Sequence, residues 1–153
     1  MHKTSAALLL AASCAAGAQP APCAHTVDGL RALLRDPQFP LAWEEISMED
    51  GRALVVTLDE RDGGLHLAIA KAGEGPWAAG HATVCTADGG LKARFDPQRL
   101  RLGAAGSWLL RQALQAGAAV NLRRVSAGEL RIGTVGWSGR FAPASPQVGL
   151  RAP

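Results

Sequence analysis

The sequence has no apolar run of the roughly 18 residues that a membrane-spanning helix needs, so we expect no transmembrane segment. No glycine-rich loop precedes a predicted helix, which is the usual way that proteins cradle phosphate groups. Tyrosine is absent, and the aromatic residues are four tryptophans and three phenylalanines. The three cysteines stand at spacings that match no zinc finger. A membrane-spanning helix, a common nucleotide-binding loop and a zinc finger are therefore excluded from our expectations.

Catalytic patterns are also incomplete. The segment Gly136–Gly139 begins like a nucleophile elbow around Ser138, but Arg140 stands where the second glycine is needed and no helix is expected to follow. Glu44 and Glu45 are adjacent, so on a strand their side chains point to opposite faces and cannot act together as acid and base. We therefore assign no catalytic residues, expect no cofactor and favour a non-enzymatic function. A hydrolase whose catalytic residues are dispersed along the chain is the alternative, and a buried titratable group beside Ser or His in a cleft would support it.

The first 18 residues have the layout of a secretory signal peptide. Lys3 supplies the positive charge, an apolar run covers residues 6–12, and Ala16-Gly17-Ala18 supplies the small residues before a cleavage point. We predict removal of residues 1–18 and export to a bacterial periplasm or to the extracellular space. In an alternative interpretation, Leu10–Cys14 is an incomplete lipobox, and the protein is a lipoprotein anchored through Cys14.

The chain beyond this segment suits one folded domain. Hydrophobic residues make up 48% of the sequence and charged residues 19%, which are ordinary values for a globular protein. We expect a mobile lead-in over residues 19–26, a single domain over 27–141 and a disordered tail over 142–153. The tail has prolines at 143, 146 and 153 and little apolar surface to pack.

Charge is distributed unevenly along the chain. Residues 28–62 have a net charge of −5, whereas residues 89–153 have a net charge of +8. Two solvated surfaces of one domain explain this pattern, and so does a basic face for an anionic partner. Nucleic acid is an unsuitable partner outside the cytoplasm. We therefore expect an amphipathic or anionic envelope ligand, or an envelope protein.

Two cysteines remain after cleavage, and an oxidising compartment favours a disulfide between Cys23 and Cys85. A metal site is the alternative. His25 lies two residues after Cys23, and His81 lies four residues before Cys85, so each pair shares one face of an extended chain. If the cysteines meet, these four side chains offer a Cys2His2 set for zinc or copper.

Two short helices are expected. Thr26 caps the first, over residues 27–35, and Ser107 caps the second, which ends at Gly117. The second helix has an apolar stripe that we expect to cover the sheet. The stripe consists of Leu109, Leu110, Ala113 and Leu114.

Alternating apolar residues between Asp-Gly turns predict hairpins. The turns at Asp50-Gly51, Asp62-Gly63 and Asp88-Gly89 predict a five-stranded antiparallel meander over residues 41–95. Further strands are expected over residues 120–125, 130–135 and 137–141, the first two joined at Ala127-Gly128. The expected fold class is α+β: a single, mostly antiparallel twisted sheet of about seven or eight short strands, with both helices on one side.

Five residues are candidates for binding. A two-residue turn at 127–128 places Arg124 opposite Arg131, where an anion can bridge the guanidiniums, with Arg140 as a third member. Of the four tryptophans, Trp77 and Trp137 lie beside loops and glycines, so we expect them to be partly exposed and able to line a pocket or partner surface.

These observations favour a small exported, non-catalytic domain that binds an amphipathic ligand or an envelope partner. An accessory or inhibitor protein acting through a protein interface is the alternative. A closed apolar cavity under the helix at 109–114 favours ligand binding. A filled core with an exposed tryptophan patch favours a protein partner.

Overall fold

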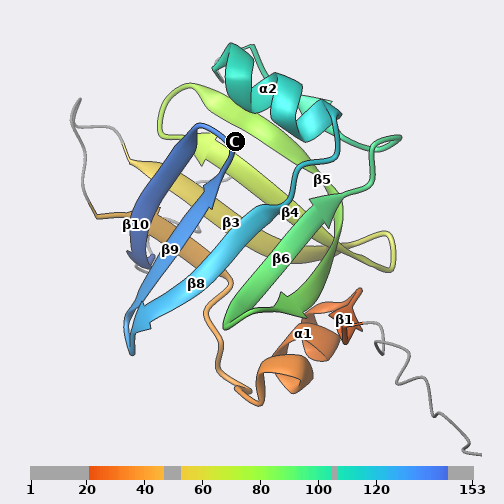
Figure 1. Cartoon of the computed structure of the whole chain (residues 1–153), viewed down its shortest axis with the longest axis vertical. Helices are drawn as coiled ribbons and strands as arrows, with labels where there is room; N and C mark the ends of the chain where they lie inside the picture. The colour runs from red at the N-terminus through yellow and green to blue at the C-terminus, as the bar shows by residue number, and fades with distance from the viewer. Residues whose placement is uncertain (1–20, 47–52, 105–106, 145–153) are drawn as a thin grey trace, which may run out of the picture.

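The computed structural model describes residues 21–46, 53–104 and 107–144. In these ranges, eight antiparallel strands form a closed barrel (Figure 1). Each barrel strand pairs with the next barrel strand along the chain, and the last pairs with the first. The barrel strands are β2 (Ala42–Glu45), β3 (Leu54–Arg61), β4 (Gly64–Lys71), β5 (Gly75–Ala87), β6 (Gly90–Phe95), β8 (Val120–Ser126), β9 (Glu129–Thr134) and β10 (Trp137–Pro143).

The expectation of an open twisted sheet covered by helices is wrong. Strand β10 pairs with β2 through the partners Phe141–Glu45, Ala142–Glu44 and Pro143–Trp43, and this pairing closes the sheet on itself. An open sheet leaves the backbone groups of two edge strands without partners, whereas closure pairs them. The alternation of apolar residues is the same in both arrangements, which is why the sequence pattern did not separate them.

Two further strands lie outside the barrel ring, and both pair with β5. They are β1 (Cys23–Ala24) and β7 (Arg101–Leu102). Strand β5 has 13 residues, so it is long enough to pair with β1 and β7 as well as with β4 and β6. Strand β1 comes from the segment expected to lie before the domain.

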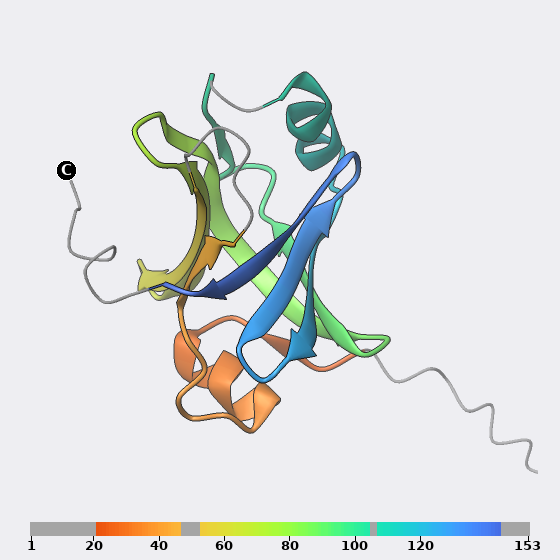
Figure 2. The same cartoon turned by 90° about the vertical axis from the view of Figure 1, so that its left-hand side faces the viewer.

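The two helices are confirmed, but they do not lie on one side of a sheet. Helix α1 (Val27–Leu34) and helix α2 (Trp108–Gln115) lie at opposite ends of the barrel (Figures 1 and 2). The hydroxyl of Thr26 accepts a hydrogen bond from the amide of Gly29 at 3.0 Å, and that of Ser107 accepts one from Leu110 at 3.2 Å. Both caps satisfy amides that a helix start leaves without partners. In the described ranges, no helix is long and apolar enough to cross a membrane.

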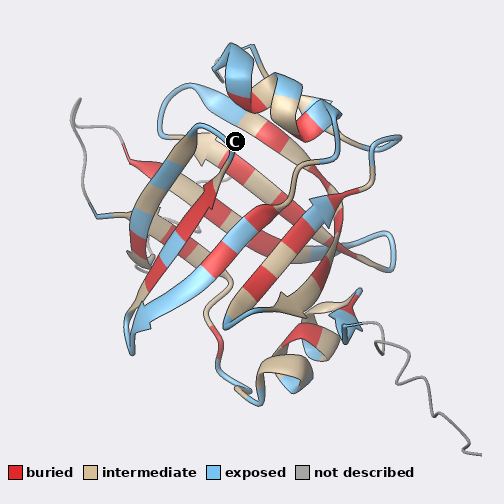
Figure 3. Ribbon diagram, viewed as in Figure 1, coloured by how far each residue is buried: buried red, intermediate tan, exposed pale blue. Residues whose placement is uncertain are grey.

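The core fills most of the barrel interior. Buried and less buried residues alternate along the strands, as period-two geometry requires (Figure 3). In β4, for example, Leu65, Leu67 and Ile69 are buried and point inward. Leu30 of α1 closes one end of the interior, and Leu110 and Leu114 of α2 close the other.

One part of the predicted helix packing is wrong. Leu109 was expected to cover the sheet with the rest of its stripe, but 59% of it is exposed. Helix α2 packs across the end of the barrel and buries only Leu110 and Leu114. The end of a barrel offers a helix a smaller contact area than the face of an open sheet does, so fewer of the side chains of α2 are buried.

The turn signals are confirmed where the structure describes them. Asp62 and Gly63 both have positive φ, 51° and 74°, and join β3 to β4 as a tight hairpin. Asp88-Gly89 joins β5 to β6, and Ala127-Gly128 joins β8 to β9. The five strands expected over residues 41–95 are present. The turn expected at Asp50-Gly51 lies outside the described residues.

Candidate functional site

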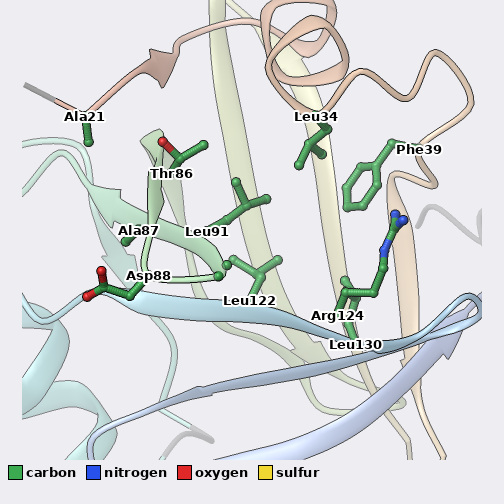
Figure 4. A pocket seen from close by; sticks show the side chains of 12 residues that line it. Ala21, Leu34, Phe39, Thr86, Ala87, Asp88, Leu91, Leu122, Arg124 and Leu130 are labelled. Carbon is green, nitrogen blue, oxygen red and sulfur yellow. The ribbon is translucent and has the colours of Figure 1, made fainter.

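A cavity of about 720 Å³ opens at the α1 end of the barrel (Figure 4). We call it the α1-end cavity. It lies between α1 with its following loop, the β5–β6 turn, and strands β8 and β9. Its size is within the roughly 300–1,000 Å³ typical of small-molecule sites. Its lining residues are Ala21, Leu34, Phe39, Thr86, Ala87, Asp88, Gly89, Gly90, Leu91, Leu122, Arg124 and Leu130.

The apolar part of this lining is held by the core. Leu91 and Leu122 are paired across β6 and β8, and both are buried. Phe39 is 2% exposed, and its ring lies 5.6 Å from that of Trp43. Leu34 of α1 lies across the cavity from Leu91 and Leu122 (Figure 4). The cavity therefore has an apolar, pre-formed wall that suits a hydrocarbon chain.

Arg124 brings a positive charge to this cavity. Its Nη2 lies 3.5 Å from Oδ2 of Asp36, in the loop after α1. Both side chains are partly exposed, at 54% and 33%. Such ion pairs contribute little to stability, on the order of 0–1 kcal/mol. Arg124 is therefore able to exchange Asp36 for an anionic group of a ligand at little cost.

The expected pairing of Arg124 with Arg131 is wrong. Ser126 faces Glu129 across the turn, as predicted, but Arg124 then faces Leu130, and it is Arg123 that faces Arg131. The register shifts between Arg124 and Ser126, so Val125 is an extra residue in the form of a β-bulge. Consecutive strand residues point to opposite faces, so Arg123 is on the outer face of the barrel while Arg124 lines the cavity.

Arg131 and Arg140 do face each other, because they are partners in the pairing of β9 with β10. Arg123, Arg131 and Arg140 thus form a row across three strands. Arg140 donates two hydrogen bonds to the carboxylate of Glu129, one of them Nη2 to Oε2 at 3.0 Å. These bonds lower the pKa of Glu129 and raise the pKa of Arg140. Arg140 is therefore occupied by an acid, whereas Arg123 and Arg131 have no salt bridge to a described acid.

A second depression lies on the outer face of β6, β8, β9 and β10, with a volume of about 410 Å³. We call it the outer hollow. Its charged lining residues are Asp88, Lys92, Arg123 and Arg131, and its other lining residues are Ala87, Gly90, Asn121, Leu122, Gly133, Thr134, Trp137 and Ser138. Arg124 and Arg140 are not among them.

Trp77 and Trp137 are both partly buried and pack against the core. The ring of Trp137 meets that of Phe141 edge to face at 6.1 Å, and Trp137 also lines the outer hollow. The most exposed large apolar side chains near α2 are instead Trp108 at 69%, Leu109 at 59% and Val135 at 68%. We call these three residues the α2 apolar patch.

Cys23 and Cys85 lie at disulfide distance, with sulfurs 2.01 Å apart, and are partners in the pairing of β1 with β5. Sulfurs bonded to each other are not free to ligate a metal. His25 is 3.4 Å from the hydroxyl of Thr83, and His81 is 2.9 Å from the carbonyl oxygen of Arg61. In the part of the chain that the structure describes, no group of three or more possible ligands is placed to hold a metal ion.

Sequence reasoning missed a polar row on the outer face of β3, β4 and β5. Asp59 faces His66, and His66 faces His81. Nδ1 of His66 is 3.3 Å from Oδ1 of Asp59, and the two imidazole rings lie edge to face at 5.9 Å. Burial and the nearby Arg61 charge lower the pKa of His66, against the opposing effect of Asp59. Asp59 and His66 are equally far from the Asp62-Gly63 turn, so the turn alone was enough to predict this pair.

Comparison of the chain with protein-family models, curated proteins and solved structures finds no match. The function is therefore argued from the geometry of these sites.

Proposed function

We propose that this protein is a small exported, non-catalytic domain that binds the apolar chain of an amphipathic ligand in the α1-end cavity. The observation that carries the proposal is the cavity itself, about 720 Å³ in volume and lined by four leucines and a phenylalanine. The charged lining residues are Arg124 and, at the β5–β6 turn, Asp88. An apolar wall with few polar groups is the usual composition of a small-molecule site.

The cavity lies at the opposite end of the barrel from the expected one. Leu110 and Leu114 of α2 are buried in the core, so the space under α2 is filled. The α1 end has room because Leu34 and Phe39 stand away from Leu91 and Leu122 (Figure 4).

Calorimetric titration with the uncharged amphiphile dodecyl maltoside, below its micelle concentration, tests this proposal. We expect saturable binding to the wild type. Leu34→Trp places a larger side chain at the cavity wall and should weaken binding by about tenfold or more, since about 1.4 kcal/mol of lost contact is enough. Leu109→Trp is the matched control, because it makes the same change on the exposed side of α2. Absence of binding to the wild type, or equal loss in both variants, would contradict the proposal.

Export is part of this proposal and is supported by the signal-like segment at residues 1–18 and by the disulfide-distance cysteines. Cys14, which the lipoprotein alternative requires, lies outside the described residues. Mass spectrometry of the mature protein separates the alternatives. A chain that begins at Gln19 supports cleavage after Ala18, whereas an acylated N-terminal Cys14 supports the lipoprotein.

A second candidate function is an accessory or inhibitory role through a protein interface. The α2 apolar patch favours it, because three large apolar side chains more than half exposed are unusual together on a small domain. Leu109 lies beside the β9–β10 turn, where its Cδ1 would be 3.9 Å from a Cβ atom on Gly136. Loss of partner capture from envelope extract by Trp108→Ser, with dodecyl maltoside binding intact, would favour this candidate.

A further inference from the structure

The outer hollow adjoins the α1-end cavity. Four residues line both: Ala87, Asp88, Gly90 and Leu122. Ala87 ends β5, Asp88 is in the β5–β6 turn, Gly90 begins β6, and Leu122 lies on β8. Gly90 lies so close to β8 that a Cβ atom there would be 2.7 Å from the carbonyl oxygen of Leu122. The backbone therefore leaves no opening between Gly90 and Leu122, and a ligand that reaches from the cavity to the outer face has to pass around the β5–β6 turn, whose residues line both spaces.

Strand β8 supplies one arginine to each of these two spaces. Arg124 lines the α1-end cavity, and Arg123 lines the outer hollow. The bulge before Ser126 sets this arrangement, because it turns Arg123 rather than Arg124 toward Arg131. Two consecutive residues of β8 thus place one positive charge in each of the two adjoining spaces.

The outer hollow has the composition of a phosphate site. Lys92, Arg123 and Arg131 supply three positive charges, and Asn121 and Ser138 supply neutral hydrogen-bonding groups. Gly133 lies among them, paired with Asn121 and Ser138 on the neighbouring strands, and β10 packs so closely there that a Cβ atom on Gly133 would be 2.7 Å from Cβ of Ser138.

The charges of the hollow are only partly balanced. None of Lys92, Arg123 and Arg131 forms a salt bridge with an acid in the described ranges, although the charge of Arg131 contributes to the lowered pKa of Glu129. Arg123 and Arg131 repel each other as direct partners. A phosphate between two guanidiniums removes that repulsion and accepts charge-assisted hydrogen bonds from both. Asp88 is the single acid of the lining and lies at the β5–β6 turn, so it disfavours an anion there and favours one deeper on the outer face.

We infer that the outer hollow binds a phosphate group carried by the same amphiphile whose chain occupies the α1-end cavity. This inference rests on the proposed function and specifies the ligand as a phosphorylated lipid. The chain enters beside Leu34 and Leu122, the ligand passes around the β5–β6 turn beside Ala87, and the phosphate meets Arg123 and Arg131.

The test compares three probes by calorimetric titration below the micelle concentrations: dodecyl phosphate, dodecyl maltoside and inorganic phosphate. We expect wild-type protein to bind dodecyl phosphate at least about tenfold more tightly than either other probe. The double variant Arg123→Gln/Arg131→Gln should lose at least about tenfold in affinity for dodecyl phosphate and keep its affinity for dodecyl maltoside. Arg99→Gln/Arg101→Gln removes the same charge from exposed positions outside both sites and should change neither affinity.

The outcomes separate the two proposals. If dodecyl maltoside does not bind the wild type, the proposed function and this inference both fail. If dodecyl maltoside binds but dodecyl phosphate gains no affinity, or the Arg123/Arg131 variant keeps that gain, the cavity function stands and the inference is overturned. Inorganic phosphate that binds as tightly as dodecyl phosphate identifies a free-anion site and also overturns it. Urea unfolding of each variant verifies that the barrel is intact.

Discussion

At the scale of single residues, His66 makes the stability of the protein depend on pH. Its pKa lies below the ordinary value of 6.5, mainly because the side chain is partly buried and secondly because Arg61 is near. The unfolded chain therefore binds a proton more readily than the folded one. The stabilisation is complete above pH 6.5, the unfolded value, and is lost as the pH falls through the lower folded value.

We expect the free energy of unfolding to fall between about pH 7.5 and about pH 5.5, and to fall less in His66→Gln. Urea unfolding at both pH values measures this difference. His25→Gln is the control, because His25 is exposed and lies at a different point on the barrel. An NMR titration that places the pKa of His66 at or above 6.5 would refute the prediction.

Single residues also show what the sequence reveals about the candidate sites and what it does not. Arg131 and Arg140 are close, as expected, but the predicted partner Arg124 is replaced by Arg123. The turn position at 127–128 is encoded locally, whereas the bulge at Val125 depends on how β8 and β9 twist against their neighbours. One extra residue reverses the face of every side chain beyond it, so the prediction chose the wrong arginine.

At the scale of elements, the short strand β7 depends on a glycine. Gly103 follows β7, and its amide donates a hydrogen bond of 2.9 Å to the carbonyl oxygen of Trp77 on β5. A Cβ atom on Gly103 would lie 1.8 Å from the carbonyl oxygen of Pro76, which is backbone and cannot rotate away. Any larger residue therefore forces β7 and β5 apart.

We expect Gly103→Ala to lower the free energy of unfolding by about 1–3 kcal/mol, as overpacking does elsewhere. Gly128→Ala is the matched control: nothing lies within 4 Å of its Cβ position, so its stability should stay close to that of the wild type. Urea unfolding measures both. Equal stability of Gly103→Ala and Gly128→Ala would show that β7 is not packed as described.

Most elements were predictable because their signals are local. Thr26 and Ser107 identify the helix starts, because each side chain accepts a hydrogen bond from the amide three residues later. Asp62-Gly63 identifies a hairpin, because two adjacent residues with positive φ make the turn. Strands β1 and β7 have only two residues each, which is too short for a recognisable alternation of apolar and polar residues. They exist because β5 offers backbone partners, which is a property of the assembled sheet.

At the scale of the whole molecule, the Cys23–Cys85 pair fastens β1 to β5 across 62 residues of chain. Closing a loop of that length in the unfolded chain corresponds to a stabilisation of about 4 kcal/mol in the chain-entropy account. We expect Cys23→Ser/Cys85→Ser to lower the free energy of unfolding by up to that amount, measured by urea unfolding. Wild-type protein with reductant should match the variant, and the variant itself should not respond to reductant. A variant as stable as the oxidised wild type would refute this prediction.

The barrel itself was not predictable from local patterns. Trp43 and Phe141 have the pattern of ordinary inward-facing strand residues. No local sequence signal near either residue indicates that their strands, β2 and β10, pair with each other. The α1-end cavity has the same origin, since Leu34, Leu91 and Leu130 come from three distant segments. The backbone N–H and C=O groups on the outer edges of the first and last strands need hydrogen-bond partners, and this requirement favours a closed barrel over an open sheet.

The pairing of β2 with β10 has a consequence for biosynthesis. Strand β2 is synthesised before the other barrel strands, and its partner β10, which closes the barrel, is synthesised after all of them. Until then, β2 and β9 each present a bare edge that accepts strands from other nascent chains. In a polypeptide that ends before Trp137, the edges of β2 and β9 stay unpaired. Such a truncated chain should therefore aggregate, rather than fold into a barrel of slightly lower stability.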